Sequence, residues 1–233
     1  MDNLRDMLRD IELEAALTCH LTGHLTGRDR LDERVMAAMA RVPRAEFLPE
    51  ETRFLAYRDG PAPIGHGQTI SQPFIVALMT DLLQPRSDAV ILEVGSGSGY
   101  QAAVLAELVA RVYSLEIVAP LAASAAATLA RLGYANVEVR QGDGYGGWPE
   151  HAPYDGIIVT AAAPHVPAPL AAQLKSGGRL VIPLGPPGGA QELHVLEKSK
   201  AGTMREWKVL DVVFVPLTGP LGLAGPGADR GVA

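Results

Sequence analysis

The alternation of strand-like and helix-like segments between residues 73 and 184 constrains this chain most. Apolar runs of strand length are separated, in most cases, by helical stretches. That order is typical of a parallel sheet covered by helices on both faces. Helices are predicted at 73–83, from the glycine loop through 110, at 119–132 and near 167–174, and strands at 89–94, 111–117, 136–140, 154–160 and 178–184. The segments 191–200 and 204–217 then predict an antiparallel hairpin, so we expect a mostly parallel α/β sheet with antiparallel C-terminal strands.

The residues before this region predict two helices and a long irregular segment. Apolar positions at helical spacing predict helices at 3–17 and 31–40, whereas prolines and glycines dominate 41–72. Long loops in compact domains are often functional. We therefore expect a single domain overall, in which helices and an active-site loop (1–72) pack on a main unit (73–219), followed by a flexible tail (220–233).

Composition and charge exclude several classes of partner. The chain has 233 residues, 48% hydrophobic and 20% charged, with a net charge of −6. This balance lacks the basic excess that attracts nucleic acid or anionic lipid, and no run is long enough to span a membrane. The start has no apolar signal-peptide core, and the single cysteine, Cys19, excludes an internal disulfide. We expect a cytoplasmic monomer.

A glycine-rich loop follows the predicted strand at 89–94. The string LEVGSGSGY places Gly95, Gly97 and Gly99 between a strand and a helix, where main-chain groups can approach a nucleotide-type ligand. A tight turn without a ligand is the simpler interpretation of these glycines alone. Glu116 ends the next strand, where its carboxylate could bind ribose hydroxyls, and Asp143 in QGDGY follows the third, where it could bind an adenine amine. Together these features favour an adenosine ligand.

The spacing of the glycines bears on the kind of ligand. A dinucleotide site normally has the pattern G-x-G-x-x-G, but here the third glycine comes one residue early and the loop has no basic residue. This favours S-adenosylmethionine, which carries no phosphate. A nicotinamide oxidoreductase remains an alternative.

Several blocks resemble the protein-L-isoaspartate O-methyltransferase family, in its bacterial form. The resemblance covers about four fifths of the chain and is most specific in IGHGQTISQP and FVPL. It implies a Rossmann-like S-adenosylmethionine-dependent methyltransferase fold, and an enzyme that methylates the free α-carboxylate of L-isoaspartyl residues in damaged proteins to start repair through a succinimide. The other matching blocks are RVPRAEFLPE, AYRDGPAP, LEVGSGSGYQ, QGDGY, APYDGIIVTAAAP and LKSGGRLVIPLG.

The resemblance also implies roles for individual residues. Ser71 matches the family's active-site serine, Glu116 would hold the ribose, and Asp143 with Gly144 the adenine. The predicted contacts with S-adenosylmethionine, or with the product S-adenosylhomocysteine, are Gln68, Thr69, Ile70, Ser71, Gly95, Gly97, Ser98, Gly99, Glu116, Asp143, Gly144 and Thr218.

The chemistry suggests why the loop around Ser71 is rich in small polar groups. An α-carboxylate with a pKa of roughly 3.5 is already an ionised nucleophile at neutral pH. Uncharged donors can orient it, whereas a lysine or arginine would stabilise its ground state and blunt its attack. Ser71 is the predicted orienting donor. Alternatively, Ser71 only caps the helix that begins at Pro73.

The substrate is expected to be an irregular or unfolded chain. VVFVPL and the small residues after the strand at 154–160 would suit main-chain pairing with such a chain, although a buried strand and a turn explain them equally well. The predicted substrate contacts are Thr69, Ser71, Ala162, Ala163, Val215 and Leu217.

Other signals and functions remain open. Cys19, His20 and His24 offer three ligands where a zinc site usually needs four, so we expect no metal. The roles of His66 and His165 are open. The alternative functions are an aspartate methyltransferase that forms a succinimide in a dedicated biosynthetic peptide, and a non-catalytic adenosine-binding or scaffold protein.

Overall fold

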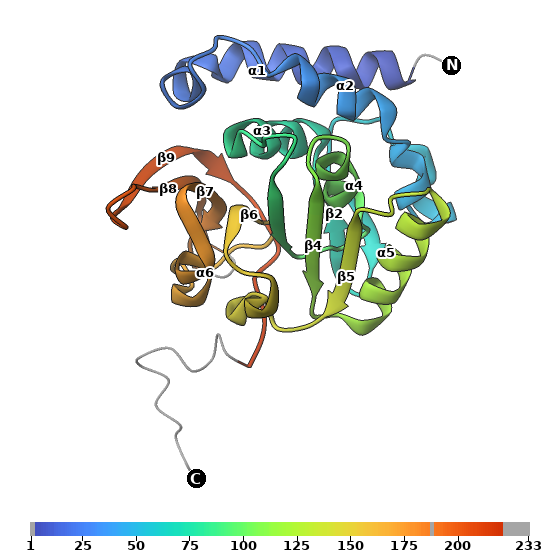
Figure 1. The fold of residues 1–233 in the computed structure, drawn as a ribbon. Helices are drawn as coiled ribbons and strands as arrows, with labels where there is room; N and C mark the ends of the chain where they lie inside the picture. Colours follow the sequence, from blue (N-terminus) through green and yellow to red (C-terminus); the bar gives the residue numbers. More distant parts are fainter. Residues whose placement is uncertain (1–2, 187–188, 221–233) are drawn as a thin grey trace.

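A seven-stranded sheet forms the centre of the molecule. The computed structural model describes residues 3–186 and 189–220. The strand order is β5-β4-β3-β6-β7-β8-β9; β3 to β7 are parallel, and β8 and β9 are antiparallel additions at one edge (Figure 1). This matches the predicted sheet. The strands are β3 (Val90–Val94), β4 (Arg111–Glu116), β5 (Val137–Gln141), β6 (Tyr154–Val159), β7 (Leu174–Leu184), β8 (Gln191–Lys198) and β9 (Met204–Val212).

Helices cover both faces of the sheet because the central strands are apolar on both. On β3, Ile91 belongs to one buried cluster, whereas Leu92 and Val94 belong to the other. The first cluster includes residues from α1 to α5, and the second includes Leu170 of α6 and Trp148. The helices are α1 (Asn3–Thr26), α2 (Glu33–Arg41), α3 (Pro73–Leu83), α4 (Tyr100–Ala106), α5 (Ala119–Arg131) and α6 (Ala168–Gln173).

The segment 41–72 is more ordered than its composition indicated. It forms two 3₁₀ helices, η1 (Arg44–Phe47) and η2 (Glu50–Leu55), and a hairpin of β1 (Ala62–Gly65) and β2 (Gln68–Ile70). His66 and Gly67 both have positive φ (53° and 70°), as a type I′ turn requires. The expectation of a wholly irregular segment was wrong, because strands of three or four residues carry too little periodicity to stand out among glycines and prolines.

The last predicted strand is shorter than expected. β9 ends at Val212, and the chain leaves the sheet instead of continuing to Leu217. It crosses to the carboxyl end of β6, where Ala162 N donates to Val215 O (2.8 Å) and Leu217 N donates to Ala162 O (2.7 Å). The prediction of a strand over 204–217 is therefore corrected. The predicted tail lies, except for Pro220, outside the described residues.

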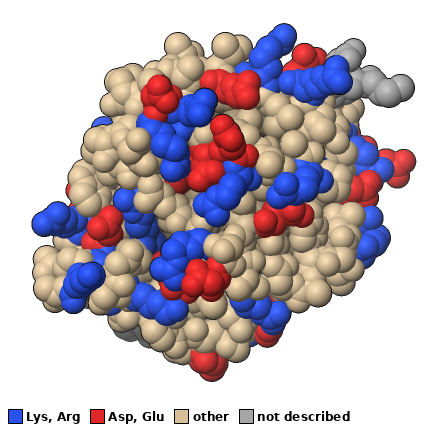
Figure 2. All heavy atoms as spheres, turned by 45° about the horizontal axis from the view of Figure 1, so that its top comes forward, with Lys and Arg blue, Asp and Glu red and all other residues tan. Residues whose placement is uncertain are grey.

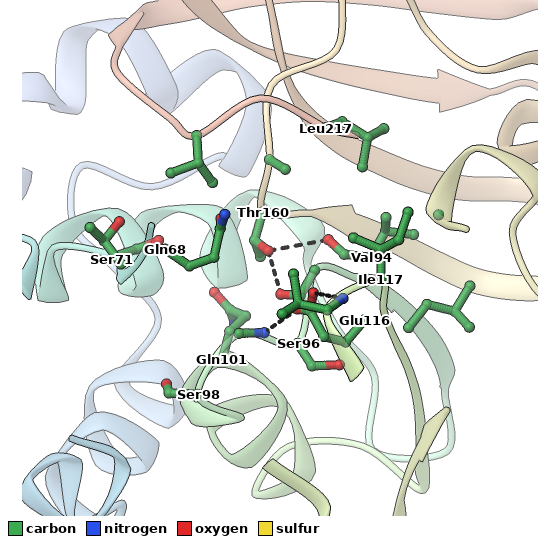
Figure 3. Close-up of a pocket in the computed structure, with 18 of the residues that line it drawn as sticks. Gln68, Ser71, Val94, Ser96, Ser98, Gln101, Glu116, Ile117, Thr160 and Leu217 are labelled. Carbon is green, nitrogen blue, oxygen red and sulfur yellow. Dashed lines mark hydrogen bonds between the residues drawn. The ribbon is translucent and has the colours of Figure 1, made fainter. Parts of the chain in front are cut away.

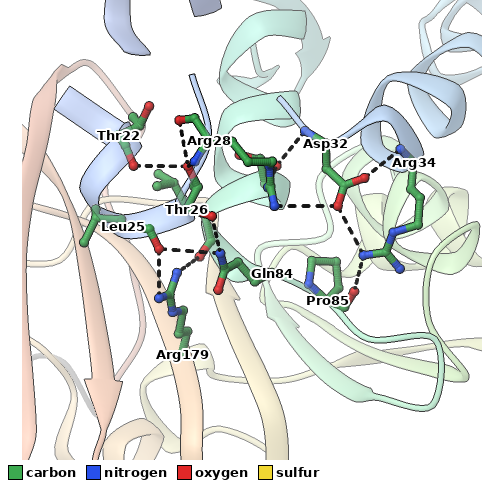
Figure 4. A network of polar contacts seen from close by, with 11 residues as sticks. Thr22, Leu25, Thr26, Arg28, Asp32, Arg34, Gln84, Pro85 and Arg179 are labelled. Atoms are coloured by element: carbon green, nitrogen blue, oxygen red, sulfur yellow. Dashed lines mark hydrogen bonds and ion pairs between the residues drawn. The ribbon is translucent and has the colours of Figure 1, made fainter. Parts of the chain in front are cut away.

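Polar contacts tie the connection between α1 and α2 to the main unit (Figure 4). Asp81 on α3 is 3% exposed and accepts hydrogen bonds from Arg28 Nη2 (2.5 Å) and the main-chain N of Asp32 (2.9 Å). Burial raises the pKa of Asp81. From β7, Arg179 donates to Leu25 O (3.1 Å) and Leu82 O (3.1 Å). These contacts fix the end of α1 against α3, above which α1 lies in Figure 1.

The surface carries charges of both signs. Figure 2 shows lysines and arginines interspersed with acidic residues over the face that includes α1, without a broad field of one sign. Many are paired; for example, Arg41 Nε lies 2.6 Å from Glu107 Oε2. None of the described helices is both long and apolar enough to cross a membrane.

Candidate active site

A hollow of about 770 Å³, including the space at its mouth, lies at the carboxyl ends of β3, β4 and β6. The strand order reverses here, with β4 on one side of β3 and β6 on the other, and open α/β sheets bind ligands at such a point. Ser71 and Gln68 lie on one side of the hollow and Glu116 and Ile117 on the other (Figure 3).

The glycine loop holds the Glu116 carboxylate in place. Gly97 N donates to Glu116 Oε2 (2.8 Å) and Val118 N donates to Oε1 (2.9 Å), while the residue is only 6% exposed. Each oxygen thus has one main-chain donor and retains capacity for another, which suits paired hydroxyl donors such as those of a ribose. The loop must come close to β6, because a Cβ on Gly95 (φ 96°) would lie 2.4 Å from Thr160 Oγ1.

Most predicted cofactor residues line this hollow, but two do not. Gly99 is the N-cap of α4 and faces α5, where a Cβ would lie 3.2 Å from Leu129 Cδ1. Asp143 accepts a hydrogen bond from Tyr145 N (2.9 Å) and lies against Gly219. Contact of these two residues with the cofactor therefore remains a prediction. Those that line the hollow are Gln68, Thr69, Ile70, Ser71, Gly95, Gly97, Ser98, Glu116, Gly144 and Thr218.

A series of buried, hydrogen-bonded side chains connects β3 and β4 to the glycine loop. Glu93 on β3 is fully buried and accepts a hydrogen bond from the Ser114 hydroxyl, whose oxygen is 2.5 Å from Ser96 Oγ in the loop. Burial, reinforced by the charge of Glu116, raises the pKa of Glu93 to about 8 despite the Ser114 hydrogen bond. Sequence reasoning missed this group, although a glutamate inside the apolar run AVILEV is a visible signal.

Ser71 does not cap α3. The N-cap residue is Gln72, and the end of the helix is satisfied by Asp59, which accepts hydrogen bonds from Phe74 N (3.2 Å) and Gln72 Nε2 (2.7 Å). Among the described residues, the Ser71 hydroxyl has no hydrogen-bond partner. The capping interpretation is therefore not supported, and the hydroxyl remains available on the wall of the hollow.

Ser71 also lies where the hollow meets a second one. A groove that extends toward α1 and the end of β9 shares Thr69, Ser71, Thr160 and Val215 with the hollow. Ser71 therefore has access to both spaces. Two reactants held in neighbouring compartments could meet beside its hydroxyl.

The predicted substrate contacts divide into two groups. Thr69, Ser71, Val215 and Leu217 line the hollow. Ala162 and Ala163 do not line either space, and their main-chain N–H and C=O groups are all paired within the chain. Main-chain pairing of a substrate with these two alanines therefore does not fit the structure; any contact through their side chains remains a prediction.

The described residues contain no cluster of three or more potential metal ligands. Cys19 instead donates its thiol to Ala16 O within α1. His66 is exposed in the β1–β2 turn, and His165 is exposed after β6.

Comparison with known proteins identifies the family. A sequence model described as protein-L-isoaspartate(D-aspartate) O-methyltransferase (PCMT) matches residues 19–222. This chain belongs to the PCMT family. Protein-L-isoaspartate O-methyltransferase 2 of Syntrophobacter fumaroxidans is 61% identical, and the match covers 81% of this chain and 76% of the relative. The protein of the same name from a Polaromonas species is 59% identical, and the match covers 81% of this chain and 90% of the relative.

Solved structures agree with the PCMT assignment. A protein-L-isoaspartate O-methyltransferase has a TM-score of 0.75 and 30% identity; the match covers 83% of this chain and 63% of that one. A Plasmodium falciparum structure described as the same enzyme, in complex with S-adenosyl-L-homocysteine, has a TM-score of 0.71 and 27% identity over 86% and 98% of the two chains.

The hollow of this PCMT family member fits S-adenosylmethionine. Its described lining includes the ribose-type carboxylate of Glu116 but no lysine, arginine or histidine that would pair with a phosphate. This donor set favours a phosphate-free adenosine ligand over a dinucleotide.

Proposed function

We propose that this protein transfers a methyl group from S-adenosylmethionine to the free α-carboxylate of L-isoaspartyl residues in damaged proteins. The observation that carries this proposal is the unpaired Ser71 hydroxyl at the junction of the hollow and the groove. The methyl ester would then lead to repair through a succinimide.

The residues of the hollow would hold the cofactor through hydrogen bonds and close packing. Glu116, already oriented by Gly97 N and Val118 N, would accept hydrogen bonds from the ribose hydroxyls. Gly144 would line the adenine end, and it packs so closely on β3 that a Cβ there would lie only 2.2 Å from Val94 Cγ1. When bound, S-adenosylmethionine supplies an electrophilic methyl group on its sulfonium sulfur.

Ser71 would orient the attacking carboxylate. The carboxylate is ionised at neutral pH, so it needs alignment and not a general base. A neutral hydroxyl can donate one hydrogen bond without neutralising the oxygen that attacks, and within 3–186 and 189–220 no cationic side chain lines either space. Alignment of this kind contributes roughly 7 to 11 kcal/mol to lowering a barrier.

The steps after methyl transfer need no residue of this protein. The next main-chain nitrogen of the substrate attacks the ester carbonyl, methanol leaves, and a succinimide closes. Water opens the succinimide to a mixture that includes normal aspartate, and the isoaspartyl fraction can be methylated again.

A paired labelling assay tests the proposal. Two peptides of identical sequence, one isoaspartyl and one aspartyl, are incubated with methyl-labelled S-adenosylmethionine, and base-labile label is counted. We expect label in the isoaspartyl peptide only; equal label in both would support an aspartate methyltransferase instead. Ser71→Ala should lower kcat by roughly tenfold or more, whereas Ser87→Ala, an exposed serine outside both spaces, should not.

We also propose that the protein works as a cytoplasmic monomer in which 1–72 and 73–219 form one domain. The net charge of −6 and the single cysteine support this, as does the buried cluster that joins α1 and α2 to the sheet. Light scattering coupled to size-exclusion chromatography would test the monomer, with a mass near 24.6 kDa expected.

A further inference from the structure

The groove beyond Ser71 is built by elements far apart in the sequence. It spans about 1390 Å³, counted out to its open side, and runs between α1, the start of α3 and the end of β9. Phe74, Ile75 and Val212 contribute apolar surface. The groove opens to solvent, as access for a peptide segment requires.

The charged side chains described along the groove are acidic. Among the described residues, Glu14 and Asp211 are its charged lining residues, and no lysine, arginine or histidine lines it. Asp211 is largely exposed, and its Oδ1 is 3.2 Å from Lys208 Nζ, which also pairs with Glu192 (2.6 Å), so its charge is partly offset and screened by water. Glu14, which is half-buried, forms no ion pair among the described residues. Glu14 is therefore the less screened of the two acidic charges in the groove.

Glu14 comes from a part of α1 that the family comparison does not cover. The family match begins at residue 19, whereas α1 begins at Asn3. The first turns of α1 are nevertheless fixed, because Met7 and Ile11 are fully buried in the main cluster. Glu14 is thus held at the groove by this chain's own N-terminal helix.

We infer that Glu14 is a specificity-determining residue that favours isoaspartyl segments with basic flanking residues and disfavours acidic ones. The inference rests on the proposed function, since it assigns the groove to the chain on either side of the damaged residue. A lysine or arginine side chain can lay its methylenes along the apolar wall and place its charge near Glu14. An acidic side chain there would meet an unpaired like charge.

Three isoaspartyl peptides of equal length, with lysine, alanine or glutamate flanks, test the inference. For the unmodified protein we expect kcat/KM to fall in the order lysine, alanine, glutamate, with roughly threefold to tenfold between neighbours. Glu14→Gln should flatten this order and Glu14→Lys should reverse it. The changes should appear mainly in KM and shrink as salt is added, because they arise from screened charges.

Glu12→Lys is the matched control. Glu12 is exposed on α1 outside the groove, and the substitution changes net charge by the same amount. It should preserve the order of the three peptides. An unchanged order in Glu14→Lys, or an equal shift in Glu12→Lys, would overturn the inference, with circular dichroism confirming that each variant is folded.

The alanine-flanked peptide distinguishes a failure of the proposed function from a failure of the role assigned to Glu14. If the unmodified protein does not methylate it, the proposed function fails. If that peptide is methylated but the lysine and glutamate peptides do not differ, the proposed function stands and the role of Glu14 is refuted.

Discussion

Replacing Glu93 by glutamine should change how stability depends on pH. Glu93 is fully buried, and burial raises its pKa from 4.5 to about 8. Glutamine has the same shape as the protonated acid and can still accept the Ser114 hydrogen bond. The substitution therefore removes the titration while leaving the packing nearly intact.

The sign and size follow from proton linkage. Between pH 4.5 and 8 the folded protein retains a proton on Glu93 that the unfolded chain has lost, so the free energy of unfolding decreases as pH rises. Each unit between the two pKa values corresponds to about 1.4 kcal/mol. The contribution of Glu93 should thus fall by about 3 kcal/mol between pH 4.5 and 7, and by about 5 kcal/mol above pH 8.

Urea unfolding of the original protein and the variant, followed by circular dichroism, would measure this difference. Comparing the two at each pH cancels the titration of other groups. We expect similar stabilities near pH 5 and a more stable Glu93→Gln variant at pH 8. Glu51→Gln, which replaces an exposed carboxylate without an ion pair among the described residues, should run parallel to the original protein. Parallel curves for Glu93→Gln as well would refute the reasoning.

Two further substitutions test the cofactor site and the support of Ser71. Glu116→Gln should weaken binding of S-adenosylhomocysteine by roughly tenfold to a hundredfold, because hydrogen bonds to a charged group contribute about 1.5 to 3 kcal/mol; calorimetry would measure it, and unchanged affinity would exclude Glu116 from the ribose site. Asp59→Ala should destabilise the protein by about 1 kcal/mol, because it removes the cap of α3, and should also lower kcat by loosening the backbone beside Ser71. Asp59→Asn should restore part of the stability and part of kcat. If Asp59→Ala loses stability but keeps full kcat, Asp59 has only a structural role.

The sheet was predictable because its signals are local and repeated. Most parallel strands contain a short apolar run, and α3 and α5 are long enough to show their own periodicity, although α4 and α6 have only seven and six residues. The β1–β2 hairpin and the end of β9 were not predictable in the same way. Ala162, at the end of β6, pairs with Val215, and nothing near either residue indicates that pairing.

The candidate site also combines residues with local sequence signals and residues whose role depends on distant contacts. Glu116 and the glycine loop could be read from the sequence, because each follows a strand and the carboxyl ends of parallel strands meet at one edge of a sheet. Ser71 was identified through a resemblance, and only its geometry distinguishes a helix cap from a free hydroxyl. The capping role belongs to Asp59, which is twelve residues earlier in the chain and reaches the helix through the fold.

The sequence by itself determined the layered α/β architecture, the strand-end position of the adenosine site and the absence of a cation in the glycine loop. These depend on periodicity and residue type, which are properties of neighbouring residues. Only the tertiary structure placed Glu14 of α1 in a groove with Ser71 and Val215, and buried Glu93 beneath the loop. Both depend on contacts between segments far apart in the chain. A glutamate at position 93 is visible in the sequence, but its link to the glycine loop through Ser114 is not.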